Sequence, residues 1–152
     1  MTERETPIAG FRAAFTVVGT LYVLMASSML VRGVGAMRDF AVPEELVTAP
    51  VFEDFFLFFY QFMAFIGVLK VVIAWTVRGR RDQVVVAGVF CVANVLFGFR
   101  DLSTSDSALG NRLYKGEATM MFVVIDVVLA LVFGYLAIRG LRTPRSAQRR
   151  PA

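Results

Sequence analysis

Ionisable and polar side chains that interrupt long apolar stretches are the first candidates for chemistry in this 152-residue chain. Asp126 is the single charge in MFVVIDVVLALVF, and Lys70 is the single charge in GVLKVVIAW. Burying a charge in apolar surroundings is costly, so such groups are candidates for proton transfer, ion pairing or ligand binding. Four uncharged polar residues share these surroundings and are further candidates: Ser27, Ser28, Gln61 and Asn94.

The residue types that are missing limit this chemistry. The chain has no histidine, and Cys91 is its only cysteine. Intramolecular disulfides, the usual zinc and iron–sulfur ligand sets, bis-histidine haem ligation and histidine-dependent triads are therefore excluded. We expect no cofactor or metal and favour a role that is not enzymatic. Lipid chemistry by Asp126, Asn94 and Lys70 would need a water-filled cleft and ranks last.

The elements that must position these residues are four apolar blocks. The chain is 57% hydrophobic, compared with roughly 45 to 50% in soluble domains. Each block approaches the ~20 residues that cross a bilayer, and none alternates like a barrel strand. The blocks are 13–31, 55–77, 83–99 and 119–138. The first block could be a signal peptide, but its length favours a retained span.

These blocks predict an all-α integral membrane protein, a four-helix up-down bundle in a single domain over 1–140. Residues 141–152 are predicted to be a disordered basic tail in the cytoplasm. Two loops should connect the spans on the other side. In the first, Pro43, Glu44 and Glu45 predict a short helix that Pro50 ends, and residues 100–117 read as a polar loop.

The distribution of basic residues predicts the orientation. Ten lysines and arginines lie before the first span, in the 2–3 turn or after the fourth span, and five lie in the other two loops. The positive-inside rule then places both termini in the cytoplasm. Lys70 and Lys115 are the only lysines, an arginine bias typical of high-GC bacteria, which predicts a bacterial inner membrane. The net charge of +4 follows this topology, so membrane lipids rather than nucleic acid are the expected partners.

Depth along the helices predicts that the polar residues form one layer. Counting ~1.5 Å per residue from each span's centre, Asp126 lies ~3 Å and Asn94 ~4.5 Å on the outer side. Gln61, Ser27 and Ser28 lie ~7 to 9 Å on the same side. This arrangement predicts a hydrogen bond between Asp126 and Asn94, and protonation would remove the charge of Asp126.

Lys70 lies ~6 Å on the cytoplasmic side, close enough for its long stem to form a buried ion pair with Asp126. Gln61 lies nine residues before Lys70, about 900° around the helix, so the two side chains leave opposite faces. Either Gln61 faces inward and the Lys70 face meets another subunit, or the reverse holds. Both alternatives predict a homo-oligomer or a subunit of a membrane complex.

The layout of the chain resembles small bacterial four-helix membrane proteins of the BphX-like and DoxX-like kind. The resemblance rests on the span FEDFFLFFYQFMAFIGV, the short basic turn, the third span leading into FRDLSTSDSALGN and the polar residue of the last span. It covers most of 10–140 and implies a small subunit, in some DoxX-like proteins one of quinone-linked oxidoreductases. It identifies no catalytic residue. The aromatic run is expected to form an interfacial belt or to bind a quinone or another lipophilic ligand.

These observations lead to two hypotheses about function. The first is a non-enzymatic accessory protein or small subunit of a membrane complex, whose polar layer binds a partner or a lipophilic ligand. The alternative is a small proton-coupled transporter in which Asp126 cycles between its protonated and ionised forms.

Overall fold

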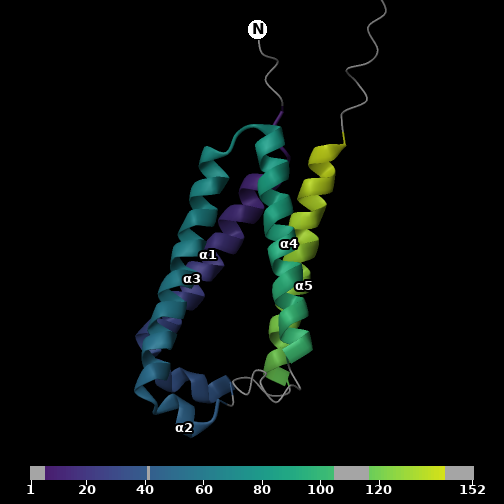
Figure 1. Ribbon diagram of the computed structural model, residues 1–152. Coiled ribbons are helices and arrows are strands. Elements are labelled where there is room, and N and C mark those ends of the chain that lie inside the picture. Colours follow the sequence, from purple (N-terminus) through teal and green to yellow (C-terminus); the bar gives the residue numbers. More distant parts are fainter. Residues whose placement is uncertain (1–5, 41, 105–116, 143–152) are drawn as a thin grey trace, which may run out of the picture.

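The computed structural model describes residues 6–40, 42–104 and 117–142 of the chain. Helices are the only regular elements in this part of the sequence, so the all-α prediction is confirmed there (Figure 1). In chain order they are α1 (Phe11–Arg32), the 3₁₀ helix η1 (Val34–Phe40), α2 (Glu44–Val47), α3 (Pro50–Thr76), α4 (Arg80–Thr104) and α5 (Glu117–Leu141). The predicted disordered tail lies outside the described residues beyond Arg142.

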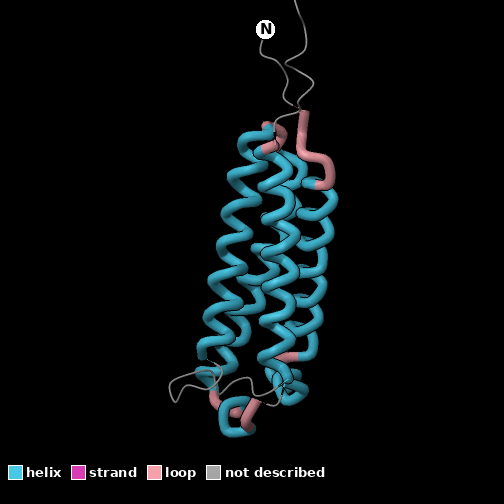
Figure 2. The backbone as a smooth tube through the Cα atoms, turned by 90° about the vertical axis from the view of Figure 1, so that its right-hand side faces the viewer, coloured by secondary structure: helices cyan, strands magenta, loops and turns pink. Residues whose placement is uncertain are grey.

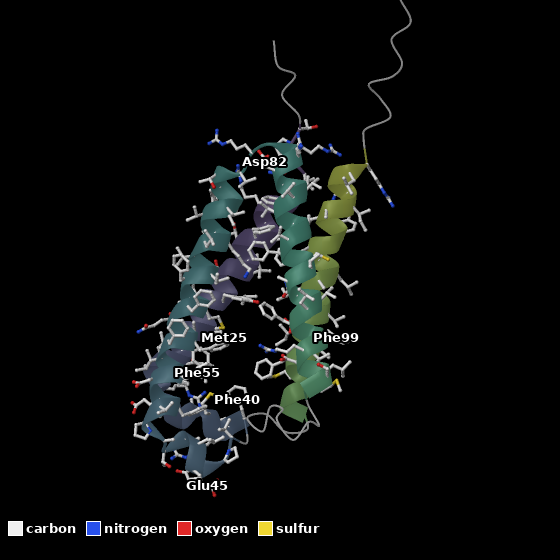
Figure 3. The ribbon with its side chains drawn as sticks, in the orientation of Figure 1. Met25, Phe40, Glu45, Phe55, Asp82 and Phe99 are labelled. Carbon is white, nitrogen blue, oxygen red and sulfur yellow. The ribbon has the colours of Figure 1, made fainter. Side chains whose placement is uncertain are left out.

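Four of these helices, α1, α3, α4 and α5, are long and apolar enough to cross a membrane. They contain 22, 27, 25 and 25 residues, more than the ~20 that a bilayer requires. They run side by side as nearly parallel rods (Figure 2). Figure 3 shows the charged residues Asp82 and Glu45 at opposite ends of the bundle. Each predicted span lies within one of these helices to within one residue.

Helix α4 continues further than its predicted span of 83–99. Residues 100–104 were predicted to belong to a loop, and this is wrong, because they complete the last turn of α4. Charged residues at the end of a span do not interrupt the backbone hydrogen bonds of a helix; they only place that turn in water. The rest of the predicted loop, up to residue 116, lies outside the described residues.

Glycine and proline residues mark the boundaries of the elements between α1 and α3. Gly33, with a φ of 70°, ends α1, because only glycine adopts this backbone conformation without strain. Pro43 directly precedes α2, which confirms the predicted short helix. The prediction that Pro50 ends this short helix is wrong: α2 already ends at Val47, and Pro50 instead starts α3, where its missing N–H costs no hydrogen bond.

The four long helices form two hairpins rather than one evenly packed bundle. Helix α1 packs along α3, and α4 packs along α5, whereas the two hairpins approach each other closely at few points. We call the end with Phe11 and Leu141 the terminal end, and the end with η1 and α2 the loop end. In Figure 1 the hairpins meet near the terminal end and diverge towards the loop end.

Two glycines set the close approach of α1 and α3. A Cβ atom at Gly19 would lie 2.6 Å from the Gly67 carbonyl oxygen, and one at Gly67 would lie 2.7 Å from the Gly19 carbonyl oxygen. Both distances are shorter than any carbon–oxygen contact that two packed helices tolerate. The absence of side chains at these positions therefore allows the two backbones to touch, as small residues do in membrane interfaces generally.

Two separate apolar clusters fill the interior. The terminal core takes residues from all four long helices. Within it the rings of Phe15, Phe90 and Phe133 pack against one another with centroids 4.9 to 5.5 Å apart, which joins α1 to α4 and α5. The buried members of the second cluster, the loop core, all come from α1, α3 and the connection between them. The hairpins thus share one core and the first hairpin has a second core of its own.

Polar contacts close the terminal end. The Gln83 side chain accepts a hydrogen bond from the Ile8 backbone N–H at 2.7 Å and donates one to the Val77 carbonyl at 3.0 Å. Arg80 donates to the carbonyl oxygens of Gly140 and Arg142 at 2.9 and 2.6 Å. The Arg80 contacts satisfy carbonyl groups that the end of α5 leaves without helical partners. The basic turn therefore has a structural role: it holds the end of α5 against the start of α4.

Candidate functional site

Lys70 is the most deeply buried charged residue in the described part of the chain, with 3% of its surface exposed. It lies on the face of α3 that contacts α1, one turn beyond Gly67. Met63 and Ala74 are buried on the same face. The interpretation in which this face meets another subunit is therefore wrong: the close approach of α1 and α3 encloses the lysine inside the protein.

Aromatic rings surround the Lys70 ammonium. Its Nζ atom lies 3.8 Å from the ring centroid of Tyr22 on α1 and 4.8 Å from that of Phe90 on α4. Both distances are within the range of cation–π attraction, which is strongest where water is excluded. Phe90 packs against the terminal core, and Ala74, a member of that core, lies one turn beyond Lys70 on α3; Lys70 therefore lies at the boundary of that core on its loop-end side.

The predicted ion pair between Lys70 and Asp126 is wrong. Among the described residues no carboxylate lies within 4.0 Å of the Lys70 ammonium. Tyr22 takes the place expected for the carboxylate: its ring faces the ammonium, and its phenol group interacts electrostatically with Asp126.

Asp126 lies half-buried on α5, beside α4. A Cβ atom at Gly98 would lie 3.3 Å from the Asp126 Cβ, so a glycine makes room for this carboxyl. Arg100 and Asp101 interact with it electrostatically. Asp126 makes no hydrogen bond within the part of the chain that the structure describes. Its two oxygens are thus free of direct partners there.

Asn94 is buried on α4 with 5% of its surface exposed, so it lies inside the bundle as expected of a candidate ligand-binding residue. Its amide nitrogen donates a hydrogen bond of 2.6 Å to the Phe90 carbonyl oxygen, one turn earlier in the same helix. The predicted hydrogen bond between Asn94 and Asp126 is therefore wrong. A carbonyl of the same helix is always within reach and competes with a partner on another helix.

The remaining candidates lie away from this group. Gln61, Ser27 and Ser28 are all exposed on the outer surfaces of α3 and α1. Of the two alternatives for α3, the one that places Lys70 inside and Gln61 outside agrees with the structure. Of the predicted layer only Asn94 and Asp126 are buried or half-buried. Lys70, predicted to lie on the other side of the midplane, is also buried, and α1 contributes Tyr22 instead of the two serines. We call Tyr22, Lys70, Asn94 and Asp126 the polar cluster.

Two features of the site were missed from the sequence. Tyr22 stands midway along the first span, and a hydroxyl group at such a position was a detectable signal. Arg100 and Asp101 were assigned to a loop, but Asp101 is buried at the end of α4 and accepts hydrogen bonds of 2.9 and 2.5 Å from the Arg100 guanidinium. They form an ion pair between the polar cluster and the loop end.

Two further features bear on what the site can hold. The described residues contain no group of three or more Asp, Glu or Cys side chains placed to bind a metal ion. A shallow apolar groove lies elsewhere, between α1 and α5 at the terminal end; Gly10, Ala14, Leu131 and Tyr135 are among its lining residues. It contains no member of the polar cluster. Comparisons of the chain with family models, curated proteins and solved structures found no match.

Proposed function

We propose that the protein is a non-enzymatic integral membrane accessory protein, or a small subunit of a membrane complex, whose polar cluster binds a lipophilic ligand between the two hairpins. The observation that supports this most is the Lys70 ammonium, enclosed by rings and without a carboxylate partner among the described residues. Aromatic rings stabilise the cation without neutralising it. The ammonium keeps hydrogen-bonding capacity for a ligand oxygen.

The separation into two hairpins favours a ligand at this position. The tight contacts run within each hairpin, and the polar cluster takes Tyr22 and Lys70 from the first and Asn94 and Asp126 from the second. A molecule entering from the loop end would separate the hairpins without breaking either helix pair. A flat apolar molecule with one or two carbonyl oxygens, such as a quinone, matches a site with a lysine donor and aromatic walls.

The absence of histidine and the presence of one cysteine support a role without catalysis, because this chain lacks the histidine base that activates serine or cysteine nucleophiles and the usual ligand sets of redox metal centres. We further propose that the protein lies in a bacterial inner membrane with both termini in the cytoplasm. This rests on the basic residues before the first span, in the turn between the second and third spans, and after the fourth span. The resemblance to BphX-like and DoxX-like proteins supports the same assignment and stays a prediction.

Native mass spectrometry of the protein, extracted in a detergent that preserves membrane complexes, tests this function. Wild-type protein should carry a small lipophilic molecule or a second protein, and Lys70→Met should lose the small molecule. Ser28→Ala serves as the control, because Ser28 is exposed and lies outside the polar cluster. A wild-type chain that carries neither a lipophilic molecule nor another protein would contradict the proposal.

Asp126 favours a second candidate function, a small proton-coupled transporter. Its carboxyl is half-buried, makes no hydrogen bond among the described residues and interacts with Tyr22 of the opposite hairpin, so its charge can act on the contact between hairpins. Uptake of ethidium into proteoliposomes under a pH gradient tests this function. If Asp126→Asn takes up ethidium as fast as wild type, the transporter hypothesis fails.

A further inference from the structure

The exposed face of α3 carries a regular stripe of large side chains. Successive members are separated by three or four residues in alternation, the spacing that keeps side chains on one face of a helix packed against another helix. Each member is exposed. We call this stripe the α3 seam; it consists of Phe58, Gln61, Phe65, Val68 and Val72.

Gln61 is the unusual member of the seam. Its amide makes no hydrogen bond within the described part of the chain. It lies seven residues, about 10 Å, from the charged Asp54 on the loop-end side and about 23 Å from the other end of α3, counting ~1.5 Å per residue. The side chain is too short to reach water at either end of the helix. An amide left in lipid without a partner is costly, which indicates that another molecule covers this position.

We infer that a second copy of this chain covers the α3 seam and that the two Gln61 amides bond to each other. A carboxamide both donates and accepts, so it is complementary to its own copy. The basic residues give every copy the same orientation, so the two α3 helices run parallel and the Gln61 side chains meet at one depth. A polar side chain at one position of such a seam sets the register of the helices.

The other seam residues are suited to this contact. Phe58 and Phe65 flank Gln61 on the same face, and their rings offer a large area for van der Waals packing, which together with interhelical hydrogen bonds drives helix association in lipid. The next position towards the loop end is the exposed Asp54, which would face its own copy beyond the lipid, where salt screens the repulsion. The seam lies on the face of α3 opposite Gly67 and Lys70, so the inference does not rest on the proposed ligand site.

Disulfide formation in native membranes tests the contact. In a Cys91→Ala background, Val68→Cys places a thiol on the seam, and Leu69→Cys places one about 100° away at nearly the same depth. Both positions are exposed, so they form a matched pair. We expect Val68→Cys to crosslink two copies and Leu69→Cys to stay monomeric. Equal crosslinking of the two variants, no crosslinking, or a crosslink to a different protein would overturn the inference.

Dimerisation measured by energy transfer between labelled copies in lipid vesicles tests the amide itself. Replacing the two reciprocal hydrogen bonds with apolar contacts through Gln61→Leu should weaken the dimer about eightfold. Phe59→Leu is the control, because Phe59 is exposed near Gln61 but lies about 200° around the helix from it, and its ring contacts Phe55 and Tyr60, which are not seam residues. If Gln61→Leu dimerises as tightly as wild type, the amide pairing is wrong.

Discussion

The terminal end and the loop end of the bundle are held together in different ways. At the terminal end, residues from all four long helices share one core, and Arg80 and Gln83 tie chain segments together. At the loop end, the buried apolar residues belong to the first hairpin and its connection, and the rings of Phe40 and Phe122 approach within 6.2 Å across the hairpins. In Figure 3 Phe40 lies in the space between the hairpins.

The two hairpins are therefore joined mainly at one end, and the polar cluster lies next to this junction. Lys70 contacts Phe90, a ring of the terminal core, and Asp126 interacts with Arg100 and Asp101, further towards the loop end. A structure joined at one end can change the distance between its hairpins at the other end with little loss of packing. Four predictions test this comparison.

The largest effect is expected from Phe133→Ala. Phe133 is fully buried in the terminal core and contacts rings of α1 and α4. Its removal should lower the free energy of unfolding by about 3 kcal/mol, as for other large buried aromatic residues. Steric-trap unfolding in bicelles measures this change. Phe99→Ala is the control, because Phe99 is 69% exposed and should change stability by less than about 0.5 kcal/mol. Equal losses at both positions would contradict a core shared by the hairpins.

A smaller decrease in the free energy of unfolding is expected when a substitution forces α1 and α3 apart. Gly67→Ala places a Cβ atom 2.7 Å from the Gly19 carbonyl oxygen, so α1 and α3 must separate, at a cost of about 2 kcal/mol. Gly88→Ala on α4 is the matched control, since no atom lies within 4 Å of its added Cβ. Alanine at that site should stabilise α4 slightly because it favours helix more than glycine does. The same unfolding measurement distinguishes the two variants, and a neutral Gly67→Ala would show that the close approach is unimportant.

Lys70→Met should increase stability. The substitution keeps most of the side-chain volume and removes a buried charge, which is often stabilising by about 1 kcal/mol when the charge has no close ionic partner. Lys70→Arg serves as the comparison, because a larger cation that cannot lose its proton should fit the rings of Tyr22 and Phe90 poorly and lower stability. A stabilised Lys70→Met that no longer carries the ligand would show that the lysine serves function rather than folding. A destabilised Lys70→Met would mean that the cation–π contacts outweigh the cost of burial.

The smallest effect on stability is expected from the ion pair of Arg38 and Glu44 at the loop end, outside the four long helices. Hydrogen bonds of 2.8 and 2.5 Å from Arg38 lower the pKa of the Glu44 carboxyl below its ordinary value of 4.5. The ionised pair therefore stabilises the loop end above that ordinary value, and the stabilisation is lost as the pH falls through the lowered pKa. Carbon-13 NMR titration of the Glu44 carboxyl measures its pKa. Arg38→Gln should return the pKa towards 4.5, and an unchanged pKa in this variant would contradict the pairing.

The sequence predicted the helices well but the contacts between their polar side chains poorly. Span positions follow from hydropathy and length, which are local properties, and the short helix α2 follows from prolines and glutamates next to it. The Asp126–Asn94 and Lys70–Asp126 pairs were inferred from depth alone. Depth gives the position of a residue along a helix, but the direction of its side chain depends on the rotation of that helix in the bundle.

Gln61 and Lys70 illustrate this limit. Their spacing of nine residues required opposite faces of α3, and the structure agrees. Spacing could not decide which face is inside, because both faces carry one polar residue among apolar ones. The contact between Gly19 and Gly67 decides it. Gly19 lies on α1, more than forty residues earlier in the chain, and its contact with Gly67 places the Lys70 face of α3 against α1.

Composition and periodicity by themselves determined that the described part of this chain is helical and that four of its helices are long and apolar enough to cross a membrane. They did so because a backbone in lipid must satisfy its own hydrogen bonds, a demand that each helix meets alone. Only the tertiary structure decided that the helices pair as two hairpins, that aromatic rings surround Lys70 and that Gln61 is exposed. These outcomes depend on glycine contacts and ring packing between distant segments, which no single helix encodes.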